Sequence, residues 1–75
     1  MLNPADIKGL WIQRMMTRNI ETGQLVESYV LHFSIRGQGD YVAIVPVSGY
    51  TKAIAEAAIS AVAEPIVETL DAFPG

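Results

Sequence analysis

Two consecutive β-type segments, residues 25–35 and 41–47, stay apolar on both of their alternating faces. Strands of this kind are typical of sheets that are covered on both sides. The 75-residue chain has room for one long helix beside them, and one helix covers one face of a small sheet. We therefore expect the other face to be covered by a partner.

Small size makes a partner more necessary. A core of this size rarely supplies more than about 3–5 kcal/mol without a metal, disulfides or oligomerisation. The chain has no cysteine and a single histidine, which excludes disulfides and a Cys/His zinc site. We expect one domain, residues 1–75, that forms a homo-oligomer or joins a larger protein assembly.

The ends and the hydropathy pattern bear on localisation. The first residues lack the charged and apolar regions of a signal peptide, and no run approaches the ~18 apolar residues of a membrane span. We expect a soluble cytoplasmic protein with no membrane partner, or a virion protein if the source is viral. Because free termini usually fray, we also expect an assembly to hold Met1 and Gly75.

The charge is unevenly distributed along the chain. The net charge of −3 argues against a nucleic-acid partner, which would require clustered basic residues. Residues 1–52 hold all five basic residues and carry +1, whereas residues 53–75 hold four acidic residues and no basic one. The two parts of the chain therefore have opposite charge.

The order of patterns predicts an α+β fold, in which a three-stranded antiparallel meander precedes a long amphipathic helix. Residues 3–9 read as a short helical turn capped by Asn3 and stopped by Gly9. Strands follow at 10–18, 25–35 and 41–47, and Pro46 suits an edge strand or a strand end. A helix then starts after Ser48 or Gly49 and runs to Phe73, either bent at Pro65 or divided there into two helices.

Turn chemistry sets the expected registers. A three-residue loop, Glu21–Gly23, places Met15 opposite Tyr29, and the second turn is taken to place Arg36 opposite Tyr41. The predicted core face is Trp11, Met15, Tyr29, Leu31, Phe33, Ile35, Val42 and Ile44. The predicted outer face is Leu10, Ile12, Arg14, Met16, Arg18, Val30, His32, Ser34, Arg36, Ala43 and Val45. A one-residue shift of the first hairpin would exchange the faces of its first strand.

The helix is expected to present one apolar and one acidic side. At 100° per residue, the apolar arc is Ile54, Ala58, Ile59, Val62, Ile66, Leu70 and Phe73. The opposite side carries Glu56, Ser60, Glu64, Glu68 and Asp71, with Val67 as its one apolar residue.

The sequence offers only weak candidates for a catalytic or ligand-binding site. Gly37-Gln38-Gly39 is too short for a phosphate loop and precedes a strand. His32 and Ser34 share a face, but no acid completes a catalytic group with them. The helix carboxylates do not converge on one ion without a second element. We therefore predict no catalytic residue, no metal, no cofactor and no small-molecule substrate.

These patterns favour a non-enzymatic structural or assembly protein that acts through self-association. Size and character, rather than a motif that identifies a family, suggest a bacteriophage virion or assembly component. In an ionic version of this hypothesis, the acidic helix side of one copy meets Arg14, Arg18 and Arg36 of the next. The predicted interface residues are Leu10, Ile12, Arg14, Met16, Arg18, Val30, His32, Arg36, Glu56, Glu64, Glu68 and Asp71.

Two alternatives remain open at this point. One is a small adaptor that binds a different protein through its sheet face or an edge strand. The other is a small enzyme that uses His32, which would require a concave pocket and an adjacent acid.

Overall fold

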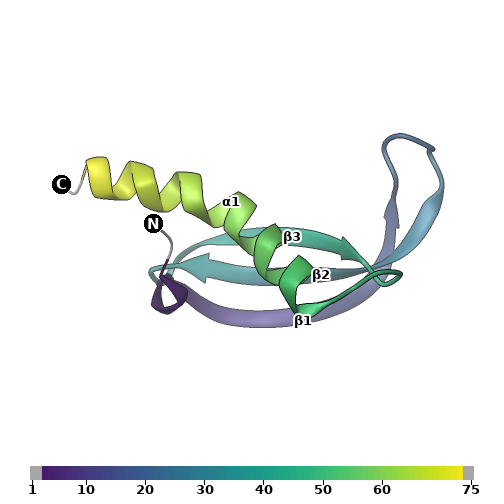
Figure 1. The fold of residues 1–75 in the computed structure, drawn as a ribbon, viewed down its shortest axis with the longest axis horizontal. Helices are drawn as coiled ribbons and strands as arrows, with labels where there is room; N and C mark the ends of the chain where they lie inside the picture. The colour runs from purple at the N-terminus through teal and green to yellow at the C-terminus, as the bar shows by residue number, and fades with distance from the viewer. Residues whose placement is uncertain (1–2, 74–75) are drawn as a thin grey trace.

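The computed structural model describes residues 3–73 as one antiparallel sheet with a helix across one of its faces (Figure 1). The elements are η1 (Pro4–Asp6, a 3₁₀ helix), β1 (Ile7–Arg18), β2 (Leu25–Ile35), β3 (Gln38–Pro46) and α1 (Lys52–Ala72). The strand order β1-β2-β3 and the C-terminal helix confirm the predicted α+β fold. The expectation about the chain ends falls on residues 1–2 and 74–75, which lie outside the described part.

The N-terminal turn is confirmed at its start and differs at its end. Asn3 caps η1, and the Asp6 side chain accepts a hydrogen bond from the Asn3 backbone. The turn ends at Ile7, where β1 begins, and so Gly9 is not the stop. Gly9 has a left-handed φ of 61° because it lies in a bulge of β1, which accommodates one extra residue opposite β2.

The predicted register of the first hairpin is wrong by one residue. Met15 lies opposite Ser28, not Tyr29. The reason is the side chain of Asn19, whose Oδ1 accepts the backbone N–H groups of Glu21 and Thr22 at 2.9 and 3.3 Å. This asparagine turn starts the loop one residue earlier than expected and moves all of β1 relative to β2.

The predicted register of the second hairpin is also wrong. Ile35 lies opposite Gln38, so the turn contains only Arg36 and Gly37, with φ of 53° and 78°. Two central residues with positive φ are the signature of a type I′ hairpin. A bulge follows at Gly39, whose φ is 74°, and it accommodates one extra residue of β3.

The new registers exchange the faces of both outer strands. Residues directly opposite in an antiparallel pair share a face, so Ala43 and Val45 join the helix side, where both are buried. Val42 and Ile44 lie on the other side and are exposed. For β2 the prediction is confirmed, since the buried core contains Leu31, Phe33 and Ile35, with Tyr29 packed against it.

The helix is continuous from Lys52 to Ala72 and passes through Pro65 without dividing. Its N-cap is Thr51, rather than Ser48 or Gly49, and the Thr51 hydroxyl accepts the Ile54 N–H at 3.1 Å. Hydroxyl capping satisfies one of the free N–H groups at the helix start.

The buried side of α1 overlaps the predicted arc but is rotated from its centre. Ala58, Ile59, Val62 and Ile66, all in the arc, are partly buried against the core. Its buried residues are Ala55, Ala63 and Val67, whereas Ile54 is largely exposed. Val67 was expected on the acidic side, yet it is fully buried. Two alanines on this side allow the helix backbone to lie close to the sheet, and tertiary packing therefore decides its rotation.

Candidate interaction surfaces

The face of the sheet turned away from α1, called here the outer face, carries several exposed apolar side chains together with the polar residues Gln13, Ser28 and His32. It is defined by the pairs Trp11–His32, Gln13–Val30, Met15–Ser28, Val30–Ile44 and His32–Val42. Val30, in the central strand, is buried beneath its neighbours, while Trp11 and Ile44 are 55% and 53% exposed. Sequence reasoning placed Trp11, Met15, Val42 and Ile44 in the core, and the two registers are the reason they were missed.

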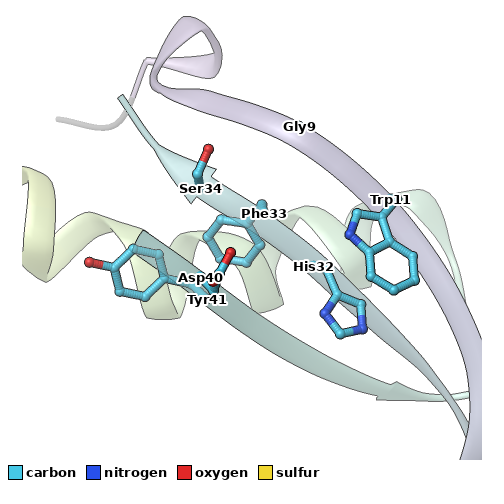
Figure 2. A pocket seen from close by; sticks show the side chains of 7 residues that line it. All are labelled: Gly9, Trp11, His32, Phe33, Ser34, Asp40 and Tyr41. Carbon is cyan, nitrogen blue, oxygen red and sulfur yellow. The ribbon is translucent and has the colours of Figure 1, made fainter. Parts of the chain in front are cut away.

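An aromatic stack lies in this outer face. The rings of Trp11 and His32 are nearly parallel, 4° apart, with centroids separated by 3.9 Å (Figure 2). His32 Nε2 also lies 3.1 Å from Gln13 Oε1. Two neighbours on β1, Trp11 and Gln13, therefore fix the position of the imidazole.

A shallow pocket of about 510 Å³ adjoins the stack, and Figure 2 shows its lining side chains. Ser34 and Asp40 line it together with His32. However, Ser34 Oγ donates to the backbone carbonyl of Lys8 at 3.2 Å, and the imidazole nitrogen faces Gln13. A nucleophile and its base should contact each other, and here each has a different partner.

The second candidate surface is the helix side of β1. Leu10 and Ile12 are each 50% exposed and Met16 is 52% exposed, because α1 packs over β3 and β2 and not over β1. An open groove of about 600 Å³ runs between β1 and α1. Its lining is Pro4, Ile7, Leu10, Glu56, Ile59, Ser60 and Glu64.

The arginines predicted at the outer face lie elsewhere and have partners within the chain. Arg14 lies on the helix side of the sheet, where it forms an ion pair with Glu27 that raises the Arg14 pKa. Arg18 donates to the backbone carbonyl of Gly23 at 2.6 Å. The prediction that both arginines lie on the outer face is therefore wrong, because the observed register pairs them with Tyr29 and Leu25 on the helix side.

Arg36 joins three separate parts of the chain. Its Nε donates to Asp6 at 3.1 Å and its Nη2 to Asp71 at 2.8 Å. The hydrogen bond from Arg36 holds the pKa of Asp6 below its ordinary value, and the bonds to Asp71 and Asp6 raise the pKa of Arg36. Asp71, predicted to contact another copy, is thus paired with Arg36 of the same chain.

The other acidic residues of α1 remain at the surface. Glu56, Glu64 and Glu68 are exposed, and Glu56 lies 3.9 Å from Lys52 in a weak ion pair. Within residues 3–73, no three acidic or histidine side chains come together as a metal site would require. In the same part of the chain, no helix is both long enough and apolar enough to cross a membrane.

No protein-family model matches the chain, and neither curated proteins nor solved structures include a significant match. The chain is therefore classified by its architecture alone. It is an α+β protein in which one helix covers part of a three-stranded meander, with an apolar outer face and an open groove beside β1.

Proposed function

We propose that the protein is a non-enzymatic structural or assembly protein whose copies associate through the outer face of the sheet. The observation that carries this proposal is the exposed apolar surface around the Trp11–His32 stack, with Val42 and Ile44 beside it. Exposed apolar side chains that gather on one face mark interaction sites in proteins. A bacteriophage virion or its assembly is the setting that we propose, on the basis of size and character.

Charge supports a second copy as the occupant of the outer face. Among the paired strand residues, Arg14, Arg18 and Glu27 all lie on the helix side. The outer face has charge near one end, at Lys8 and Asp40. In a two-fold contact the same surface meets itself, so a face without charge at its centre avoids opposing like charges.

The size of the face indicates how strong this contact can be. Three strands spaced by ~4.8 Å and about ten residues long, at ~3.3 Å per residue, cover roughly 450 Å² in projection. A standard interface buries about 800 Å² on each partner. We therefore expect weak association through this face. Such a contact forms to a significant extent where the local concentration of the chain is high.

The test compares two variants that add the same charge. Ile44→Glu places a carboxylate at the outer face, while Ile20→Glu places one in the first hairpin loop, where Ile20 is 98% exposed. We expect Ile44→Glu to raise the dissociation constant at least tenfold, because a buried unpaired charge is costly, and Ile20→Glu to have little effect. Sedimentation equilibrium at two salt concentrations measures both constants, with circular dichroism as the check on folding.

Two outcomes would contradict the proposal. One is a wild-type chain that stays monomeric at ~100 μM in low and high salt. The other is equal weakening by both variants. A monomer of this kind that binds an apolar dye on its outer face would instead favour the adaptor function, for which the free edges of β1 and β3 offer sites for strand addition.

A further inference from the structure

We infer that association through the outer face is controlled by pH, because protonation of His32 places a positive charge inside that contact. This inference rests on the proposed self-association and adds its regulation. Copies of the chain associate near neutral pH and separate as the solution becomes mildly acidic.

His32 lies near the centre of the outer face. It belongs to the central strand β2, directly opposite Trp11 on β1 and Val42 on β3. It is the single histidine of a chain without cysteine, and histidine is the side chain whose charge ordinarily changes between pH 5 and 8. A contact that covers the outer face of two copies therefore encloses one such group from each.

The side chains around His32 contain no partner for a charged imidazole. On β1 the ring stacks on Trp11, and its Nε2 lies 3.1 Å from Gln13 Oε1. The other polar side chains that line the pocket beside the ring, from β2 and β3, are Ser34, Asp40 and Tyr41 (Figure 2). The ion pairs among residues 3–73 do not include His32, so Asp40 does not neutralise it.

The separate chain can hold the protonated ring. Gln13 Oε1 can accept a hydrogen bond from an Nε2–H group, and the face of the Trp11 ring attracts a cation. His32 is also only half-buried and so keeps some contact with water. Mild acid should therefore leave the fold of the single chain intact.

The contact between two copies cannot hold the protonated ring as easily. Removal from water disfavours the charged form of histidine, and a two-fold contact brings the same surface of both copies together. Lys8 and Asp40, near one end of the outer face, have opposite charges. Protonation of His32 therefore changes this face from neutral to positive in both copies, and the two positive faces repel each other.

The experiment measures the dissociation constant at pH 7.5 and pH 5 for wild type and His32→Gln. Because each wild-type copy takes up a proton on separation, we expect its constant to rise at least tenfold at pH 5. Glutamine does not titrate, so we expect a change of less than twofold in His32→Gln. Sedimentation equilibrium gives the constants, and circular dichroism at both pH values checks the fold.

Two further variants make the comparison specific. His32→Phe keeps an aromatic ring beside Trp11 without a titrating group, and it replaces His32→Gln if glutamine itself weakens association. The double variant His32→Gln/Ile20→His restores one histidine at a loop position that is 98% exposed. We expect both variants to associate equally at the two pH values.

Failure of this inference is distinct from failure of the proposed function. A wild-type dimer that is equally strong at both pH values, or stronger at pH 5, contradicts the inference while association through the outer face can still stand. A response to pH that persists in both His32→Gln and His32→Phe contradicts it in the same way. A wild-type chain that is monomeric at ~100 μM at both pH values contradicts both proposals.

Discussion

The helix side of the sheet contains two regions of similar sequence character and very different burial. On β2 and β3, Leu31, Phe33, Ala43 and Val45 are almost completely buried beneath α1. On β1, Leu10 and Ile12 face the same side and remain half exposed. Hydrophobicity does not separate the two regions, so the difference must come from what covers them.

Geometry explains this difference. Three strands at ~4.8 Å spacing are about 14 Å wide with their side chains, and one helix with its side chains is ~10–12 Å in diameter. A single helix therefore covers about two strands. In this chain α1 lies over β3 and β2, and β1 is the strand that remains uncovered. The comparison teaches that a one-helix meander of this size leaves apolar surface for a partner.

The largest expected effect compares one leucine from each region. Leu31→Ala removes a side chain that is 1% exposed, and deletions of this kind cost about 2–5 kcal/mol, close to the whole stability of so small a domain. Leu10→Ala removes a half-exposed side chain and should cost less than about 1 kcal/mol. Urea unfolding of the dilute monomer, followed by circular dichroism, measures both. Equal losses would mean that β1 is covered within the monomer, which would remove the comparison.

An effect of intermediate size on the free energy of unfolding is expected from a substitution in α1. Pro65 has no N–H to donate within α1, and an interior proline costs about 3 kcal/mol relative to alanine. Proline also restricts the unfolded chain, which offsets up to ~1 kcal/mol of that cost. We expect Pro65→Ala to raise the free energy of unfolding by about 1–3 kcal/mol. Ala61→Ser, at an exposed position one turn earlier, is the control, and a midpoint that falls for Pro65→Ala would show that the proline fits its site.

The smallest expected effect concerns the ion pairs that connect η1, the β2–β3 turn and α1. The pKa of Asp6 is lowered below its ordinary 3.8 by the hydrogen bond from Arg36. Since the folded pKa is the lower one, this stabilisation is complete above about pH 4 and is lost as the pH falls through the folded pKa. We expect Arg36→Gln to reduce the loss of stability between pH 5 and 2.5.

Arg18→Gln is the matched control for this pH experiment. It removes the same charge, but Arg18 donates to the Gly23 carbonyl rather than to a carboxylate. Urea midpoints at several pH values give the comparison. If the two variants and wild type lose stability in parallel on acidification, the Asp6–Arg36 pair contributes nothing measurable.

The elements themselves and the core face of β2 could be predicted from the sequence, but the faces of β1 and β3 could not. The strand at 25–35 and the helix through residue 72 follow from local apolar patterns, and the structure confirms both. The face of β1 depended on the side chain of Asn19, which starts the first loop one residue early. The face of β3 depended on the two-residue turn at Arg36 and the bulge at Gly39. Each device shifts pairing by one or a few residues, and an odd shift exchanges the faces of a whole strand.

The sequence predicted that apolar surface would remain uncovered by the helix, and the structure corrected which residues form it. Of the residues expected on the outer face, Val30 and His32 lie there, while Leu10, Ile12 and Met16 line the helix side of β1. The outer residues Trp11 and Ile44 were expected in the core. Their exposure left no signal in composition, since the same apolar pattern fits either face.

By itself, the sequence determined that this chain forms three strands and a helix, and that it has more apolar surface than one helix can cover. Local periodicity and residue counts are sufficient for both conclusions. Only the tertiary structure decided which surfaces stay open, namely the outer face around Trp11 and the groove beside β1. The physical reason is that turn and bulge geometry sets strand register, and close packing against Ala55 and Ala63 sets which strands α1 covers.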